Sequence, residues 1–349
     1  MIDGGPDYVA TREYSGENQP QESLRHHDGW LRVDRIAERS GYFEGPRLSF
    51  HFQRAPDGGR YDSLDIQNKF GGDAFRPEPV KTEKRATYLG ETCAIWDLVS
   101  PPAITWRKHV FERDCVTSDG IIVAHGRADQ DGGIREPPIW RLTSLTRTAV
   151  AEEDVSPPPE LFDWRNFTIF AALPPAPGAE SDVDFVTRME GYFAVHGAGV
   201  RYRKRHFPWV RTDTKFEDGA WDVTIDNTQN HAQLLFRAEK QGAFAYLSIS
   251  EPRTWMPDRG SDAGQERVIV KSGTLLGEAC KITTNLRAER RRTKWHTADG
   301  IELKYKAVGG RLANPEEWTA VDLQRRTVDL AEVMPPDEIF DRARWGLSR

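Results

Sequence analysis

Short stretches in which apolar and polar residues alternate cover most of the chain, separated by Gly, Pro and Asp-Gly breaks. In the first half they lie at 30–36, 47–52, 61–66, 94–99, 121–126 and 140–150. In the second half they lie at 209–214, 221–227, 232–239, 243–250, 280–286, 301–308 and 318–328. Alternation with a period of two predicts half-buried β-strands, whereas helical periodicity is weak. Asp119-Gly120 and Asp299-Gly300 stand where hairpin turns are expected, because this pair accepts positive φ at little cost.

Six sequence blocks of the first half recur in the second half in the same order. The pairs are 7–16 with 184–193, 29–35 with 208–214, 89–93 with 276–280, 117–121 with 297–301, 145–150 with 323–328, and 155–163 with 333–341. The spacing of about 180 residues is far longer than a solenoid repeat and predicts two copies of one domain. We expect copy one at 1–166, a Pro/Ala-rich linker at 167–182 and copy two at 183–349.

These patterns predict a mainly β protein that consists of two tandem curved antiparallel sheets, or half-barrels. The Pro-containing segments 158–164 and 335–345 are expected to start short helices. We therefore expect a short helix or loops over the concave face of each sheet. A sheet that is curved enough to have an inside can hold a ligand there.

The composition is that of a rather polar folded protein, with 38% hydrophobic and 29% charged residues and a formal net charge of −6. The acidic balance provides no overall basic field, so we expect no nucleic-acid partner. No apolar run is long enough for a transmembrane segment, and the first residues do not resemble a signal peptide. The chain is therefore either cytoplasmic or a trimmed mature form from the periplasm or outside the cell, and both compartments stay open. We expect a monomer.

The order of motifs in each half resembles that of the LolA-like superfamily, which comprises the outer-membrane lipoprotein carriers and their relatives. The motifs are Trp-x-Arg-x-Asp, Leu-Gly-Glu-x-Cys, Thr-x-Asp-Gly-Ile, Leu-x-x-Arg and a terminal Pro-Pro-x-x-Phe. They cover about 7–165 and 184–345 and are most similar to uncharacterised bacterial branches of the superfamily. The resemblance implies a half-barrel with an apolar concave side, in which characterised relatives hold acyl chains or a peptide.

Cys93 and Cys115 lie 22 positions apart on two strands that the predicted hairpin brings together. In an oxidising compartment a disulfide between them would contribute about 3 kcal/mol on the chain-entropy model. Two buried reduced cysteines are the alternative. In the second copy Trp295 stands near the place of Cys115, so we expect Cys280 to be a buried free thiol and the indole to fill the space.

No sequence motif points to a catalytic site, a metal ion or a cofactor. The nucleophile motif Gly-x-Ser-x-Gly, the glycine-rich phosphate loop and the dinucleotide fingerprint are absent, and the nine histidines show no chelating spacing. Glu91 and Asp119 recur as Glu278 and Asp299 at the same places of the second copy, so we expect these carboxylates to serve the fold. We therefore expect no catalytic residue, no metal site and no cofactor.

Two groups of residues are candidates for binding. Three tryptophans that are unique to one copy are candidates for a pocket or an interface: Trp106, Trp221 and Trp255. In an extended strand, Arg201, Arg203 and Arg205 lie on one face. They are candidates for contact with an anionic surface, and a solvated edge strand that resists edge-to-edge pairing is the alternative.

Together these observations favour a non-catalytic binding protein. The expected ligand is apolar or amphipathic, that is a lipid, an acyl chain or a peptide, and it would lie in the concave cavity of a sheet. Two other interpretations stay open: a scaffold that binds a protein partner, and an enzyme whose residues no motif reveals. An apolar cavity would favour the first interpretation, an exposed apolar patch the second, and a cleft with converging His, Asp or Ser side chains the third.

Overall fold

The computed structural model describes residues 5–16, 21–69, 78–99, 110–171, 183–250, 267–287, 290–309 and 315–347. The chain forms two compact units, unit 1 (Met1–Leu161) and unit 2 (Phe162–Arg349). Nearly all regular structure is antiparallel β-sheet that does not close into a barrel. The predicted mainly β fold class is therefore confirmed.

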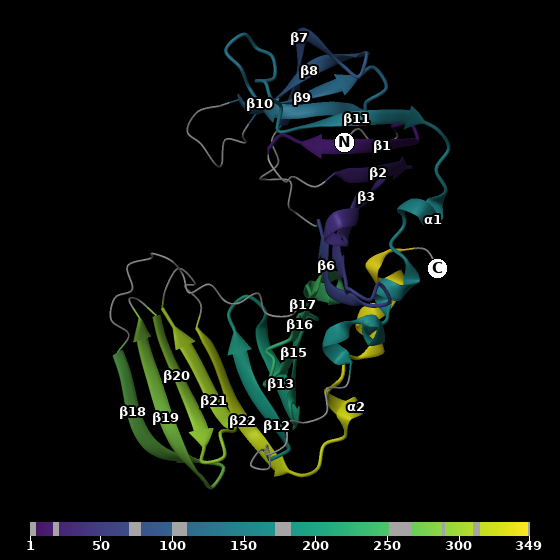
Figure 1. Cartoon of the computed structure of the whole chain (residues 1–349). Helices are drawn as coiled ribbons and strands as arrows, with labels where there is room; N and C mark the ends of the chain where they lie inside the picture. The colour runs from purple at the N-terminus through teal and green to yellow at the C-terminus, as the bar shows by residue number, and fades with distance from the viewer. Residues whose placement is uncertain are drawn as a thin grey trace. The chain divides into compact units, whose positions relative to one another are not determined.

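Unit 1 has eleven described strands, which pair in the order β7-β8-β9-β10-β11-β1-β2-β3-β4-β5-β6. Their bounds are β1 (Tyr8–Tyr14), β2 (Glu22–His27), β3 (Trp30–Arg35), β4 (Ser40–Glu44), β5 (Leu48–Arg54), β6 (Tyr61–Asn68), β7 (Glu78–Tyr88), β8 (Glu91–Val99), β9 (Val110–Thr117), β10 (Ile122–Arg127) and β11 (Trp140–Arg147). The pairing of β11 with β1, visible in Figure 1, joins two meanders into one antiparallel run.

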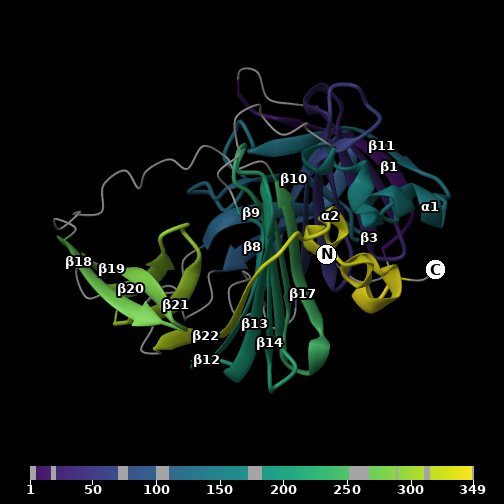
Figure 2. The ribbon, with the colours of Figure 1, turned by 90° about the horizontal axis from the view of Figure 1, so that it is seen from below.

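Unit 2 has eleven described strands in the order β18-β19-β20-β21-β22-β12-β13-β14-β15-β16-β17. Their bounds are β12 (Phe185–Phe193), β13 (Gly197–His206), β14 (Trp209–Phe216), β15 (Trp221–Asn227), β16 (Gln233–Ala238), β17 (Phe244–Ser250), β18 (Arg267–Leu275), β19 (Glu278–Arg287), β20 (Arg290–Thr297), β21 (Glu302–Val308) and β22 (Glu316–Arg325). Figure 2 shows β22, β12, β13 and β14 running side by side. The first strand of each unit thus pairs with the second and the eleventh.

Short helical segments follow the last strand of each unit. The helix α1 (Glu152–Val155) packs against β2 and β3, and α2 (Leu330–Val333) packs against β13 and β14. Among the described residues, the 3-10 helices are η1 (Ile36–Glu38), η3 (Pro159–Phe162), η4 (Trp164–Asn166), η5 (Thr168–Phe170), η6 (Lys240–Gly242), η7 (Asp337–Phe340) and η8 (Arg342–Trp345). Among the described residues, no helix has the length and apolar character needed to cross a membrane.

Each unit buries the apolar side chains that alternate along its strands. One cluster of unit 1 consists of Ala10, Leu24, Leu31, Val33, Cys93, Ile95, Cys115, Ile121, Val123, Ala124, Ile134 and Leu142. One cluster of unit 2 consists of Phe185, Met189, Phe216, Ala220, Cys280, Ile301, Leu303, Trp318 and Ala320. Because residues two apart in a strand share a face, the alternation seen in the sequence places these side chains together.

The structure divides the chain between Leu161 and Phe162, whereas the sequence analysis places a linker at 167–182. Residues 162–171 pack within unit 2. Phe167 is fully buried, and the ring of Phe170 stacks on the indole of Trp209 at 5.5 Å between centroids. The first residues of the expected linker are therefore structured, because their aromatic side chains bury apolar area.

Candidate functional site

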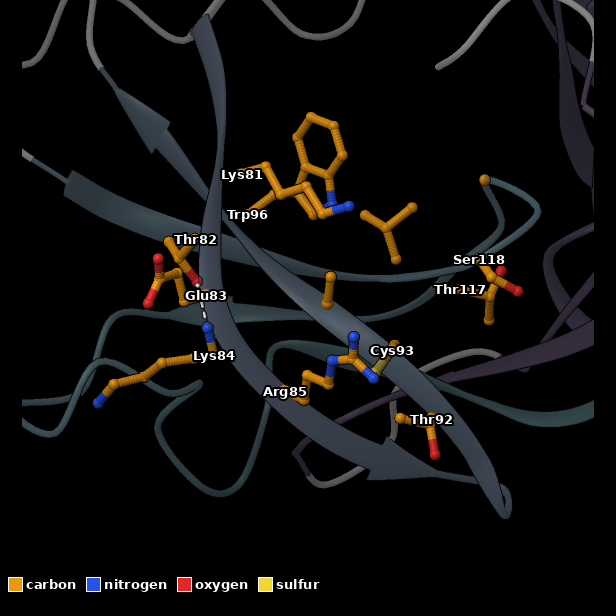
Figure 3. A pocket seen from close by; sticks show the side chains of 13 residues that line it. Lys81, Thr82, Glu83, Lys84, Arg85, Thr92, Cys93, Trp96, Thr117 and Ser118 are labelled. Carbon is orange, nitrogen blue, oxygen red and sulfur yellow. Dashed lines mark hydrogen bonds between the residues drawn. The ribbon is translucent and has the colours of Figure 1, made fainter.

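A recess of about 750 Å³ lies over β7, β8 and β9 of unit 1, and we call it the Trp96 recess. Its lining residues are Lys81, Thr82, Glu83, Lys84, Arg85, Thr92, Cys93, Ala94, Trp96, Val116, Thr117, Ser118 and Gly120. Figure 3 shows the indole of Trp96 beside the aliphatic chain of Lys81, with Thr117 and Ser118 on the other side of the view. Apolar and polar groups therefore share this hollow.

An irregular β7 shapes the recess. Lys81 pairs with Trp96 and Arg85 pairs with Ala94, so three residues of β7 stand opposite the single residue Ile95. The hydroxyl of Thr82 donates to the carbonyl oxygen of Ile95 at 2.9 Å, which satisfies a carbonyl that the bulged strand leaves unpaired. A bulge of this kind bends its strand and re-aims its side chains.

The recess carries an excess of positive charge. Lys81, Lys84 and Arg85 are exposed cations of the lining, and Glu83 is the only carboxylate among the described lining residues. None of the three cations forms an ion pair with a described residue. Trp96, by contrast, is half-buried and offers an apolar face. A ligand with an anionic head and an apolar part would find both complements here.

A disulfide joins two of the strands that carry the recess. The structure joins Cys93 and Cys115 with a Cα–Cα distance of 5.3 Å, and Cys93 contributes to the lining. The bridge connects β8 to β9 within the buried cluster of unit 1, so these two strands of the recess are held together covalently. Cys280 in unit 2 is a buried free thiol, and Trp295 packs against its cluster.

The structure describes one of the three tryptophans that the sequence singled out as pocket or interface candidates. Trp106 and Trp255 lie outside the described residues. Trp221 is 7% exposed and lies edge-on to Phe236 with 5.0 Å between ring centroids, and the ammonium of Lys215 sits 5.1 Å from its ring. Trp96 was not among the three, although a comparison of the two copies could have found it, because Thr283 stands at its ladder position in unit 2.

Arg201, Arg203 and Arg205 follow β13 at alternate positions and are partly buried. Arg201 lies 4.1 Å above the ring of Trp318 and donates to Glu316 at 3.1 Å. Burial lowers the pKa of the Arg201 guanidinium, and Glu316 opposes that shift. Arg203 lies 3.7 Å from a carboxylate oxygen of Glu302. Two of these three candidates for an anionic surface thus already face carboxylates of the chain.

The residues that recur in both halves of the sequence build a four-residue clasp in unit 1. Arg147 donates through Nε to Asp119 at 2.5 Å and through Nη1 to Glu91 at 2.9 Å. Thr117 Oγ1 donates to Asp119 at 2.6 Å and accepts from the backbone N–H of Ile121 at 2.9 Å. The Arg147 and Thr117 hydrogen bonds hold the pKa of Asp119 at about 2.

Unit 2 contains the same clasp. Arg325 donates through Nε to Asp299 at 2.7 Å and through Nη1 to Glu278 at 2.8 Å, and Thr297 Oγ1 donates to Asp299. The pKa of Asp299 is likewise about 2. In unit 1 this network joins the β9–β10 and β7–β8 turns to the last strand, β11. In unit 2 it joins the β20–β21 and β18–β19 turns to β22, so the role of both networks is structural.

Unit 1 also holds a buried polar network between β1 and β2. Glu22 is fully buried and accepts hydrogen bonds from Arg12 and, at 2.6 Å, from Arg35 Nε. Tyr42 accepts from Arg12 Nη2 at 3.0 Å, and the Arg12 guanidinium stacks on Trp140 at 4.8 Å. Every charge of this network is paired, as burial requires, so the network offers no open binding group.

The described residues hold no group of three or more His, Cys, Asp or Glu side chains that could bind a metal ion. His125 Nδ1 lies 2.8 Å from Asp114 and its ring stacks on Trp140. His196 Nδ1 lies 3.1 Å from Asp218. Asp114 stands opposite Trp96 across β8 and β9 but is not among the lining residues of the Trp96 recess.

No protein-family model matches the chain, and no curated protein matches it. Among solved structures, PNGF-II is similar at a TM-score of 0.30 and 10% identity, over 44% of this chain and 30% of that chain. An outer membrane lipoprotein-sorting protein domain from Vibrio parahaemolyticus is similar at a TM-score of 0.23 and 11% identity, over 46% of this chain and 90% of that domain. The chain thus spans under a third of the length of PNGF-II. At these TM-scores neither likeness bears on function.

Proposed function

We propose that the chain is a non-catalytic binding protein and that its Trp96 recess holds an amphipathic anion. The observation that carries this proposal is the combination, in one place, of a hollow of about 750 Å³, one half-buried indole and three cations without an ion-pair partner among the described residues. That volume lies within the range of about 300–1,000 Å³ that small-molecule sites occupy.

The two kinds of lining group assign the two ends of the ligand. Lys81, Lys84 and Arg85 would contact the anionic head through charge-assisted hydrogen bonds. Trp96 and Val116 would cover the apolar part and remove it from water. A fatty acid, an alkyl phosphate or an acidic peptide with an apolar side chain has this chemistry.

The proposal moves the expected ligand from the concave face to the recess beside β7. In unit 1 the cluster around Val33, Ile95 and Val123 is filled by side chains of the chain itself, and in unit 2 the cluster around Trp318 is filled as well. An acyl chain would have to displace these side chains, whereas the Trp96 recess is already open.

Dodecyl phosphate below its micelle concentration is the test ligand, with binding measured by calorimetry. The variant K81Q/K84Q/R85Q is expected to weaken binding by about tenfold or more, because charge-assisted hydrogen bonds are lost. The control R188Q/R237Q/K240Q removes the same charge from exposed positions of unit 2 and is expected to bind like the wild type. Trp96→Ala is expected to weaken the binding of dodecyl phosphate but not that of inorganic phosphate.

Two outcomes contradict the proposal. One is the absence of saturable binding of dodecyl phosphate by the wild type. The other is equal weakening by the recess variant and by the unit 2 control, which would indicate a non-specific charge effect.

We further infer that the two units are copies of one domain. The equal order of strands, the two clasps of Arg147 and Arg325 and the recurring sequence blocks support this inference. The order of motifs supports placing both copies in the LolA-like superfamily. In that case the Trp96 recess belongs to copy one only. The residues at the corresponding positions of the strand pairs in unit 2 are Val270 in place of Lys81 and Thr283 in place of Trp96.

A further inference from the structure

A second recess, of about 380 Å³, lies in unit 1 where β2, β3, η1 and the β5–β6 turn meet, and we call it the arginine recess. Its lining residues are Ser23, Arg25, Arg32, Asp34, Arg35, Ile36, Arg39, Ser40, Phe52, Arg54, Pro56, Asp57 and Gly58. Five of these described residues are arginines and two are carboxylates. The lining is therefore strongly positive within a chain whose net charge is −6.

Three of the five arginines already have carboxylate partners. Arg25 and Arg32 share Asp34, at 3.3 Å and 2.8 Å. Arg35 donates to the buried Glu22 at 2.6 Å. These ion pairs shape the wall of the recess and leave little of their charge for a ligand.

Arg39 and Arg54 supply the remaining charge. Neither forms an ion pair with a described carboxylate. The guanidinium carbon of Arg54 instead lies 5.1 Å from the centroid of the Tyr61 ring, a cation–π contact that uses none of its N–H donors. Two guanidinium forks without carboxylate partners in one concave site fit the oxygens of a phosphate.

The backbone holds these two arginines next to each other. Arg39 caps η1 in the left-handed conformation, with φ of 52°, and its carbonyl oxygen accepts from the N–H of Arg54 at 2.8 Å. A non-glycine residue in this conformation is strained, and such strain persists only where the surroundings enforce it. The backbone hydrogen bond therefore holds the Cα atoms of Arg39 and Arg54 close together in the lining of the recess.

Unit 2 lacks basic counterparts of Arg35 and Arg54, although Lys204 and Arg211 stand at the places of Arg25 and Arg32. When the strand pairs of the two units are aligned, Thr214 of unit 2 stands at the position of Arg35 and Ala238 at that of Arg54. Ser40 falls on Asp222, whose carboxylate binds Arg237 at 3.0 Å. The arginine recess is thus particular to unit 1, although the strands that form it have counterparts in unit 2.

We propose that the arginine recess binds a phosphate group, with Arg39 and Arg54 as its charged contacts. The hydroxyl of Ser23 lies in the same lining and adds a neutral donor, whereas Ser40 Oγ donates to Glu38 at 3.3 Å. Ile36 is 78% exposed at the edge of the recess, where it would contact the organic part of a phosphate monoester. This site is distinct from the Trp96 recess and does not depend on it.

The test measures binding of inorganic phosphate and of phenyl phosphate to the full chain by calorimetry at constant ionic strength in chloride. R39Q/R54Q is expected to weaken both by about tenfold or more. The control R188Q/R237Q carries the same loss of charge in unit 2 and is expected to bind like the wild type. R54K keeps the charge and is expected to restore part of the affinity, which separates a lost contact from a lost fold.

The two ligands distinguish free phosphate from a phosphate monoester. Tighter binding of phenyl phosphate, lost in Ile36→Ser, indicates a monoester, whereas equal affinity indicates the free anion. The loss of affinity caused by R39Q/R54Q is expected to be the same in the wild-type background and in the K81Q/K84Q/R85Q background, so that failure of the Trp96 proposal would not affect this one. The proposal is overturned if neither ligand binds saturably, or if R39Q/R54Q binds both as tightly as the R188Q/R237Q control.

Discussion

Transplanting the disulfide of unit 1 into unit 2 tests the correspondence between the units most directly. In unit 1, Cys93 pairs with Thr117 and Cys115 with Ile95. In unit 2, Cys280 pairs with Thr297, and Trp295 pairs with Ile282 in the same register. Trp295→Cys therefore places a thiol relative to Cys280 as Cys115 stands relative to Cys93. We expect the introduced thiol to form a bridge with Cys280 under oxidising conditions, in the background Gly273→Ala.

The second substitution follows from the space that the indole occupies. A Cβ at Gly273 would lie 2.8 Å from Ile282 Cδ1 and 3.2 Å from Trp295 Cζ3, and the residue at this ladder position in unit 1 is Ala86. Gly273→Ala alone is therefore expected to cost about 1 kcal/mol through overpacking. With Trp295 replaced by cysteine the clash with the ring disappears, so the two changes are expected to couple favourably.

The magnitude comes from the length of the loop that the new bridge closes. A loop of about 15 residues gives roughly 3 kcal/mol on the chain-entropy model. Loss of the half-buried indole of Trp295 offsets part of this gain, because large-to-small changes in a core cost about 3–5 kcal/mol when burial is complete. The effect of the bridge alone is the difference in unfolding free energy of unit 2 between the oxidised and the reduced variant, since both states lack the indole.

Two measurements decide the outcome. Thiol titration in denaturant should find one free thiol in the wild type, which has three cysteines and one disulfide, and none in the double variant. Urea unfolding should show a loss of about 3 kcal/mol when the variant is reduced. Two reactive thiols in the oxidised double variant would refute the correspondence of register, and Gly273→Ala with one thiol is the matched control.

Two further predictions concern the clasp and the packing of unit 2. Asp119→Asn is expected to cost about 0.5–1 kcal/mol at pH 7, because the ion pair with Arg147 is partly exposed. The fold lowers the pKa of Asp119 to about 2, so the ionised carboxylate stabilises the protein fully above pH 4. The difference in unfolding free energy between the variant and the wild type should therefore shrink as the pH falls towards 2. An equal difference in urea titrations at pH 7 and pH 3 would contradict this cause. Gly191→Ala is expected to destabilise unit 2 by about 1–3 kcal/mol, because its Cβ would meet the Trp318 ring at 2.6 Å and a neighbouring backbone oxygen more closely still. Unchanged thermal unfolding of that variant would argue against this close packing.

Local patterns in the sequence predicted the β architecture well. Strands are visible there because alternation is a property of consecutive residues and needs no knowledge of the partner strand. The Asp-Gly turns were also predictable, since Gly120 and Gly300 adopt positive φ as expected. For Glu91 and Asp119 the sequence predicted a structural role but not their common partner. That partner, Arg147, lies 56 and 28 positions away from them along the chain.

The binding sites depended on tertiary structure. The Trp96 recess exists because β7 slips in register between Lys81 and Arg85, and the arginine recess exists because a left-handed residue brings Arg39 beside Arg54. Neither event leaves a periodic signal, and which cations remain unpaired depends on every carboxylate that folding brings near. The sequence by itself therefore determined the strands, the turns and the kind of fold, because these follow from neighbouring residues. Only the tertiary structure decided where charge stays unbalanced, because that is a sum over contacts between distant parts of the chain.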